Sequence, residues 1–149
     1  FIYARKSNIK FFSITDFIAP LIPIGLGLGR AGNFINGELW GRPTNGDWGM
    51  IFYHVDSLPR HPSQLYQFFL EGVLMFFLIW FLSNKVKTRG MLSGIFLITY
   101  GTFRYLVEFF REPDAHLGLF MSQSYGQVLS IPMIIFGMLI LFFAKRHHL

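Results

Sequence analysis

The sequence contains no cysteine, little charge and none of the common hydrolase motifs. Without cysteine, these residues cannot form a disulfide, a thiolate metal site or a cysteine nucleophile, so any thiol chemistry would use a thiol of the substrate. The H-E-x-x-H zinc motif, the G-x-S-x-G nucleophile elbow and acid pairs at glycosidase-like positions are also absent, and ordinary hydrolase classes therefore lose support. We expect neither a metal nor a cofactor.

Apolar residues dominate what is present. Hydrophobic residues occupy 52% of the 149 positions, and 19 residues are phenylalanine, which is more apolar side chain than a soluble domain of this size can bury. We predict an all-α integral membrane protein, a polytopic helical bundle with a single membrane domain over residues 1–149. The predicted spans are residues 14–29, 64–82, 91–110 and 123–144, with a loop at residues 31–61 between the first two. Because the first span is short and contains Pro20 and Pro23, we expect it to be kinked or broken.

The lysines and several arginines occupy three stretches, which we call the basic connections: one before the first predicted span, one between the second and third, and one after the fourth. They are Arg5, Lys6 and Lys10, then Lys85, Lys87 and Arg89, and finally Lys145 and Arg146. Loops of this kind remain in the cytoplasm, so we place both ends of the chain there and predict that the loop at residues 31–61 is extracytoplasmic. The net charge of +5 does not indicate nucleic-acid binding, because the basic residues form no single face interleaved with aromatic residues.

A glycine-rich polar segment, residues 29–42 (GRAGNFINGELWGR), follows the first predicted span. Glycine lets backbone approach a ligand closely, and Arg30, Asn33 and Glu38 are among the polar groups crowded beside it. Irregular backbone at membrane depth normally lines a cavity. The segment is therefore a candidate site, and a solvated glycine-rich turn is the alternative.

Other patterns in this part of the chain carry weaker signals. Residues 27–32 match the G-x-G-x-x-G fingerprint, but nucleotide binding is not supported because the strand and βαβ unit that this fingerprint requires are missing. We expect Gly25 and Gly29 instead to let a neighbouring helix approach closely. Histidine can act as an acid–base group, but isolated loop histidines such as His54 and His61 are usually solvated, and we favour neither as a catalytic base.

The third predicted span carries Tyr100, Arg104 and Glu108 at intervals of four residues. This spacing places a phenol, a guanidinium and a carboxylate on one face of the helix. Charges at membrane depth are rare and usually mark function. We therefore favour a functional site over a purely structural Arg104–Glu108 ion pair.

Two arginines at the same predicted depth suggest an anion-binding site. Arg30 and Arg104 both fall near the outer end of a span, where guanidiniums suit the phosphate of an anionic phospholipid. In this hypothesis Glu38 and Glu108 hold the arginines, and Asn33 donates to a phosphoryl or glycerol oxygen. A transporter or channel subunit with an anion site remains an alternative, although it would also place polar groups near the bilayer centre. A noncatalytic assembly subunit is a third possibility.

Three stretches stand out in order along the chain: residues 29–42, residues 61–66 (HPSQLY) and residues 100–114 (YGTFRYLVEFFREPD). Together they resemble the signature of the prolipoprotein diacylglyceryl transferase family. The resemblance extends from about Asp16 to the end of the chain. It implies that this chain is a piece of a longer protein and that an N-terminal half is missing here.

The resemblance also implies an activity in the bacterial inner membrane, with the active site toward the extracytoplasmic side. The family transfers the sn-1,2-diacylglyceryl group of phosphatidylglycerol to the lipobox cysteine of a prolipoprotein, the first step of lipoprotein maturation. The thiol attacks the glycerol carbon bonded to phosphate, which forms a thioether and releases glycerol 1-phosphate. Carried over by motif, the catalytic residues are Arg30, Tyr100, Arg104 and Glu108, and the phosphatidylglycerol-binding residues are Arg30, Asn33, Glu38 and Arg104. The family's histidine–glycine motif, a candidate base, belongs to the missing half, so this piece alone should be catalytically incomplete.

One position departs from the family pattern. The family usually carries glutamate directly after the HPSQLY motif, where this chain has Gln67. Glu71 lies inside the second predicted span and needs a partner there. Either Glu71 or Gln64 is a candidate to take over the role of the absent carboxylate.

Overall fold

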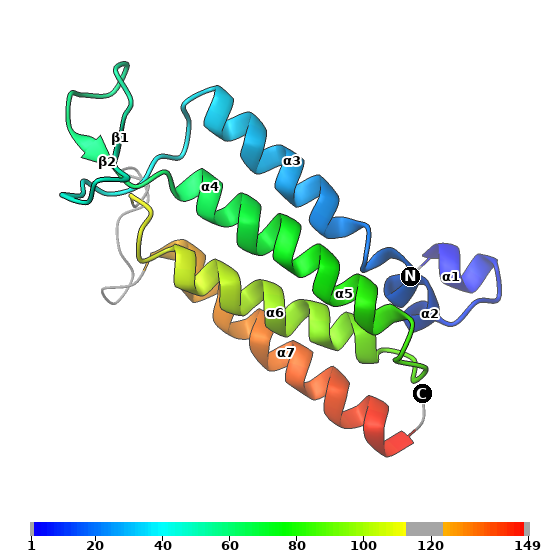
Figure 1. The fold of residues 1–149 in the computed structure, drawn as a ribbon. Coiled ribbons are helices and arrows are strands. Elements are labelled where there is room, and N and C mark those ends of the chain that lie inside the picture. The colour runs from blue at the N-terminus through cyan, green and yellow to red at the C-terminus, as the bar shows by residue number, and fades with distance from the viewer. Residues whose placement is uncertain (1, 113–123, 148–149) are drawn as a thin grey trace.

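Long helices run side by side and form the body of the molecule (Figure 1). The computed structural model describes residues 2–112 and 124–147. Its elements are α1 (Ile2–Lys6), α2 (Phe11–Ile18), α3 (Ile22–Ile35), β1 (Met50–Ile51), β2 (Pro59–Arg60), α4 (Ser63–Gln67), the π-helix η1 (Phe68–Leu74), α5 (Met75–Ser83), α6 (Met91–Val107) and α7 (Tyr125–His147). α4, η1 and α5 follow one another directly and form one continuous helix.

Two of these helices are long and apolar enough to cross a membrane, Ser63–Ser83 and Tyr125–Arg146. The pair of α2 and α3, bent by 45°, also passes as one span, so the described residues contain two or three candidate spans. α6 is apolar but has only 17 residues, fewer than the roughly 20 that a straight crossing requires. The predicted all-α membrane class is confirmed, whereas the number of four spans remains a prediction.

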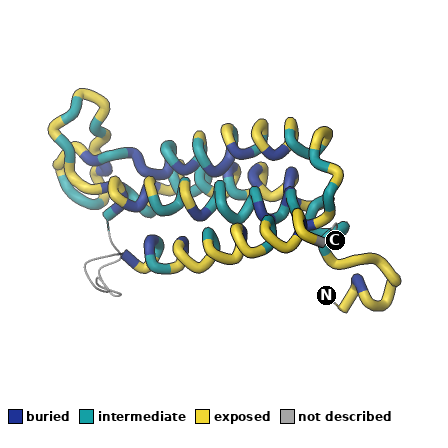
Figure 2. Tube along the Cα trace, turned by 90° about the horizontal axis from the view of Figure 1, so that it is seen from below, coloured by how far each residue is buried: buried dark blue, intermediate teal, exposed yellow. Residues whose placement is uncertain are grey.

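Figure 2 shows exposed positions along the long helices, and many large apolar side chains are exposed there. Phe77 is 63% exposed and Phe136 is 61% exposed, whereas the small core contains Met75, Ile79 and Leu92. A soluble monomer rarely exposes so much contiguous apolar surface. This distribution fits helices that face lipid.

The first predicted span is bent, as its prolines indicated. α2 ends at Ile18, and Pro23 occupies the first turn of α3, where its missing N–H would have no helical partner. The helix continues beyond Gly29, the predicted end of the span, and ends at Ile35. Arg30 and Asn33 therefore lie on a helix and not in a re-entrant loop.

A Schellman motif ends α3. The N–H of Gly37 donates to Phe34 O at 3.1 Å, and the N–H of Glu38 donates to Asn33 O at 2.8 Å. Gly37 has a φ of +67°, a left-handed conformation that glycine adopts readily. This glycine of the predicted site segment thus serves as a helix stop.

Glycines bring two pairs of helices into close contact. A Cβ atom placed on Gly72 of η1 would lie 2.7 Å from the Cα atom of Gly27 in α3, and one on Gly94 of α6 would lie 3.0 Å from Gly137 O of α7. At α3 the expected residues, Gly25 and Gly29, were wrong. Among the described residues, no atom of another helix lies within 4 Å of a Cβ placed on either glycine.

The two ends of the bundle differ in character. Figure 1 shows α1, the α5–α6 connection and the end of α7 at one end, and the hairpin of β1 and β2 at the other. The three basic connections therefore share one end, opposite to the loop. At the basic end, Asp16 of α2 caps α6 by accepting hydrogen bonds from the N–H groups of Gly90 at 2.6 Å and Ser93 at 2.8 Å.

α7 begins with a reciprocal pair of capping hydrogen bonds. The N–H of Ser124 donates to Gln127 Oε1 at 3.1 Å, and the N–H of Gln127 donates to Ser124 Oγ at 3.3 Å. The predicted start of this span, Gln123, lies outside the described residues, as does Asp114 at the end of the third motif.

Candidate functional site

Five charged side chains meet between α3, η1 and the end of α6. The ion pairs join Arg30 Nε to Glu71 Oε2 at 3.6 Å, Arg104 Nη2 to Glu108 Oε2 at 3.3 Å, and Arg111 Nη1 to Glu108 Oε1 at 3.5 Å. Glu71 also interacts electrostatically with Arg104 and Glu108, which joins the two groups of pairs. We call these five residues the charged cluster. With all members ionised, three arginines and two glutamates leave one net positive charge.

The charged cluster is largely removed from solvent. The side chain of Glu71 is fully buried, that of Glu108 is 3% exposed, and those of Arg30 and Arg104 are 16% and 15% exposed. Buried charges are tolerated when they are paired, and removal of one partner is strongly destabilising. Each carboxylate of the cluster accordingly has an arginine beside it.

From the sequence, Glu71 was a charge in need of a partner and one of two candidates for the role of the carboxylate that is absent at Gln67. Its partner is Arg30, which reaches it from α3 at a point where Gly27 and Gly72 allow the two backbones to approach. Glu71 lies within the π-helix η1, and π-helical turns frequently occur at functional sites because they redirect side chains. No local sequence pattern predicted this pairing.

The stripe predicted on the third span is present. Arg104 and Glu108 form an i,i+4 ion pair, and the ring of Tyr100 stacks on Phe96 with centroids 6.1 Å apart. Tyr100 lies within electrostatic range of Arg30 of α3 and of Arg104. The structure therefore brings four of the motif-derived residues, Arg30, Tyr100, Arg104 and Glu108, into one place.

The first turn of α7 closes the site beside Glu108. A Cβ atom placed on Gly126 would lie 2.6 Å from the Glu108 carboxylate. Glycine thus leaves the space that this carboxylate occupies, and the start of a helix favours a negative charge nearby. The sequence analysis missed Gly126, although a glycine in the first turn of an apolar helix is itself a weak signal of close approach.

Asn33 and Glu38 stand apart from the charged cluster. Glu38 is exposed and forms no salt bridge with any residue that the structure describes, so the expectation that it holds an arginine was wrong. Its backbone oxygen instead accepts a hydrogen bond from Gln64 Nε2 at 2.6 Å. Asn33 is partly buried and ends α3 through its backbone oxygen.

A buried polar stripe leads along α4 and η1 to the charged cluster. Gln64, Gln67 and Glu71 are all fully buried. Among the described residues, the side-chain nitrogen and oxygen of Gln67 and both carboxylate oxygens of Glu71 have no hydrogen-bond partner. Buried polar atoms are nearly always satisfied in native proteins, so this stripe is suited to polar groups of a ligand or to water.

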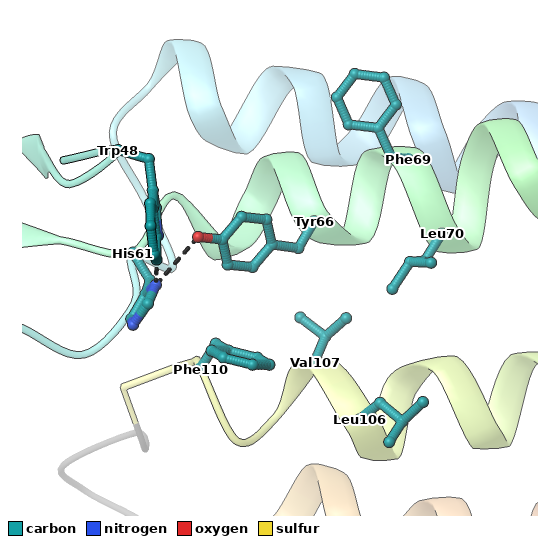
Figure 3. Close-up of a pocket in the computed structure, with 8 residues that line it drawn as sticks. All are labelled: Trp48, His61, Tyr66, Phe69, Leu70, Leu106, Val107 and Phe110. Atoms are coloured by element: carbon teal, nitrogen blue, oxygen red, sulfur yellow. Dashed lines mark hydrogen bonds between the residues drawn. The ribbon is translucent and has the colours of Figure 1, made fainter. Parts of the chain in front are cut away.

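An apolar cavity of about 540 Å³ lies between the α4–η1 helix and α6. Its lining residues are Trp48, His61, Tyr66, Phe69, Leu70, Leu106, Val107 and Phe110. Figure 3 shows Leu70 and Val107 pointing toward each other from the two helices, and Tyr66 pointing toward His61 at the loop end. Because η1 and α6 also carry members of the charged cluster, the apolar cavity and the charged cluster share the same two helices.

His61 is packed into the wall of this cavity and is not a solvated loop residue. Its Nδ1 atom lies 3.4 Å from Trp48 Nε1 and 3.0 Å from Tyr66 Oη, and its ring packs on Phe110 with centroids 5.3 Å apart. Tryptophan can only donate, so Nδ1 is the acceptor and the proton of the neutral ring is assigned to Nε2. The other loop histidine, His54, hydrogen-bonds Gly37 O at 2.7 Å.

Arg60 ties the loop to the end of α6. Its guanidinium contacts Asp56 Oδ2 at 2.7 Å, Gly41 O at 3.1 Å and Glu112 Oε2 at 3.4 Å. The hydrogen bond from Arg60 lowers the pKa of Asp56 below its ordinary value, and the same bond raises the pKa of Arg60. These contacts fix the loop to the segment that follows α6.

Among the described residues, no group of three histidine, aspartate or glutamate side chains could hold a metal ion. The polar chemistry available at this site thus comes from arginine, carboxylate, amide and phenol groups. Guanidinium forks bind phosphate and carboxylate groups in bidentate geometry.

The fold and the site define a polytopic helical membrane protein with a buried arginine–carboxylate cluster beside an apolar cavity. The sequence profile of one family, described as prolipoprotein diacylglyceryl transferase, matches residues 1–143. The chain belongs to this family.

Similar proteins are named phosphatidylglycerol–prolipoprotein diacylglyceryl transferase. One from Nitrosomonas europaea is 57% identical over 97% of this chain and 52% of its own length. Another from Methylobacillus flagellatus is 56% identical over 97% of this chain and 56% of its own length. A third, from Pseudoalteromonas atlantica, is 54% identical over 98% of this chain and 54% of its own length. The chain thus spans about half the length of the curated relatives it matches.

Proposed function

We propose that the full-length protein transfers the sn-1,2-diacylglyceryl group of phosphatidylglycerol to the lipobox cysteine thiol of a prolipoprotein and releases glycerol 1-phosphate. One observation carries the proposal. The Nη1 atom of Arg104 is buried and has no hydrogen-bond partner among the described residues, inside a cluster with one net positive charge. A phosphodiester supplies both the missing acceptor and one negative charge. The names of the relatives include the same lipid and protein substrates.

The reaction balances as a single displacement. The thiol sulfur forms a bond to the glycerol carbon, the bond from this carbon to the phosphate oxygen breaks, and the electron pair stays on the phosphate, which leaves as glycerol 1-phosphate. The thiol loses its proton to a base that is not assigned among these residues. Guanidiniums already in place stabilise the charge that develops on the departing phosphate, a contribution that typically amounts to about 3 kcal/mol per donor.

Each motif residue receives a role in this proposal. Arg30 and Arg104 bind the phosphate, and Glu108 orients Arg104. Tyr100 orients Arg30 or donates to a phosphate oxygen. Asn33, at the end of α3, is assigned to the glycerol headgroup.

Glu38 also lines the phosphatidylglycerol site in this proposal, but it does not hold an arginine. Its place at the entrance follows from its exposure and from the hydrogen bond between its backbone oxygen and the buried Gln64.

The apolar cavity supplies the environment for hydrocarbon. Its walls are almost entirely aliphatic and aromatic, as expected of a site for an acyl chain or for the apolar part of a signal peptide. We assign the bacterial inner membrane as location and the extracytoplasmic side as the side of the active site. The position of the three basic connections at the opposite end of the bundle supports this orientation.

The test uses the full-length protein in proteoliposomes with a precursor peptide that carries a lipobox cysteine. Vesicles with phosphatidylglycerol should yield a thioether-linked diacylglyceryl peptide and an equal amount of glycerol 1-phosphate. Vesicles with phosphatidylethanolamine alone, and a peptide with serine in place of the cysteine, should yield neither. Solute flux without lipid turnover would instead support the transporter alternative, which the transferase names of the relatives do not favour.

A further inference from the structure

Glu71 is the buried carboxylate that pairs with one of the two arginines assigned to the phosphate. It pairs with Arg30 of α3 at 3.6 Å and interacts electrostatically with Arg104 of α6. We propose that Glu71 is a positioning residue that holds the Arg30 guanidinium against Arg104, so that both arginines reach one phosphate group. This inference rests on the proposed transferase function and adds a residue that the three motifs do not contain.

The backbone around Glu71 is built for this contact. The π-helix from Phe68 to Leu74 replaces α-helical geometry in the middle of an otherwise regular 21-residue helix. Directly after Glu71, Gly72 touches Gly27 so closely that a Cβ atom on Gly72 would lie 2.7 Å from the Gly27 Cα atom. Arg30 follows Gly27 by three residues and so lies on the same face of α3. The π-helix and the glycine contact together deliver a fully buried carboxylate to this arginine.

The geometry of the pair leaves the arginine available to a ligand. The contact joins the Nε atom of Arg30 to Glu71, and the two Nη groups therefore remain for a phosphate. A separation of 3.6 Å is too long for a strong hydrogen bond. Glu71 thus fixes the direction of the guanidinium without occupying the end that would bind phosphate.

Glu71 also sets the charge of the site. The charged cluster carries one net positive charge with Glu71 ionised and two when an amide replaces it. A phosphodiester such as phosphatidylglycerol has one negative charge, whereas the phosphate monoester product approaches two near neutral pH. Replacement of Glu71 by glutamine should therefore slow the reaction and strengthen the binding of the product. A purely structural tie between α3 and η1 would not produce this combination.

The experiment compares Glu71→Asp, Glu71→Gln and the control Glu112→Gln in the full-length protein. Glu112 also pairs with an arginine, but its side chain is 44% exposed and lies in the loop region. The measurements are kcat, KM for phosphatidylglycerol and inhibition by glycerol 1-phosphate, each normalised to the protein in the membrane. Glu71→Asp keeps the charge but shortens the side chain by about 1.5 Å, and we expect kcat to fall roughly tenfold to a hundredfold because displaced groups lose that much.

For Glu71→Gln we expect a larger loss of kcat, together with inhibition at glycerol 1-phosphate concentrations about tenfold lower, which corresponds to ~1.4 kcal/mol. Glu112→Gln should retain the wild-type values. A wild-type rate in Glu71→Asp overturns the proposal, as does a Glu71→Gln variant whose product inhibition weakens in step with its activity. If Glu71→Gln does not accumulate in the membrane, the kcat of Glu71→Asp alone tests the proposal. A wild-type protein that forms no thioether refutes the proposed function itself, whereas failure confined to these variants refutes only the role of Glu71.

Discussion

Replacement of Arg104 by lysine removes a planar fork while keeping the positive charge. The Arg104 side chain is 15% exposed, and its Nη2 atom pairs with Glu108 at 3.3 Å. Its Nη1 atom is buried without a hydrogen-bond partner among the described residues. A guanidinium can therefore serve Glu108 with one arm and a phosphate with the other. The ammonium group of lysine is a point charge on a flexible stem and cannot reproduce this geometry.

The expected loss follows from the removal of one donor at a developing anion. Such a change costs about 3 kcal/mol of transition-state stabilisation, which corresponds to a rate reduction on the order of a hundredfold. Membrane insertion should stay the same, because lysine and arginine cost similar amounts, about 3 kcal/mol, at the centre of a membrane helix. The assay is transfer of labelled diacylglycerol from phosphatidylglycerol to a precursor peptide, normalised to the protein in the membrane.

Arg89→Lys is the matched control for Arg104→Lys. Arg89 is exposed at the opposite end of the bundle and forms no salt bridge with any described residue, so the same chemical change there should leave the rate unchanged. If Arg104→Lys also keeps nearly full activity, Arg104 acts only as a charge or as a structural tie. The two-armed phosphate clamp would then be wrong.

Four further predictions concern other parts of the molecule. Glu108→Gln should reduce kcat less than removal of the Arg104 guanidinium does, because an amide oxygen still accepts a hydrogen bond. Equal and complete loss of activity in the Glu108 variant and in the Arg104 variant would assign the Glu108 carboxylate a direct role in proton transfer. Gly126→Ala should lower activity, with a packing cost of roughly 1–3 kcal/mol at the Glu108 carboxylate, whereas Gly25→Ala, which has open space around it, serves as its control. Cysteine at Asn45 should react with an impermeant thiol reagent in spheroplasts, and labelling only after the membrane is broken would refute the assigned orientation. The pKa of Asp56 is lowered in the folded state, so its stabilisation of the hairpin is present above the ordinary aspartate pKa of about 4. This stabilisation should be lost as the pH falls through the lowered value, and hydrogen exchange in the hairpin should show that loss in the wild type but not in Asp56→Asn.

Features that depend on neighbouring residues in the chain could be read from the sequence. The hydrophobic composition defined a helical membrane protein, and Pro20 and Pro23 indicated the bend between α2 and α3. The four-residue spacing placed Arg104 beside Glu108, because residues one turn apart on a helix are always neighbours. These conclusions follow from covalent geometry and helix periodicity, which are nearly independent of the rest of the fold.

Features that depend on how separate helices approach each other were decided only by the tertiary structure. Glu38 was expected to help hold the arginines, but the partner of Arg30 is Glu71, because α3 continues into the glycine-rich segment as far as Ile35 and meets η1 at Gly27 and Gly72. The packing of His61 into an apolar cavity likewise required the loop to fold back over α4 and α6. Many glycines could have formed such a contact, and the choice among them is made by the complementary surfaces of two whole helices. This complementarity depends on many residues of both helices at once and so cannot be predicted from a pattern of single residues. It is defined only by the shape and charge of the assembled bundle.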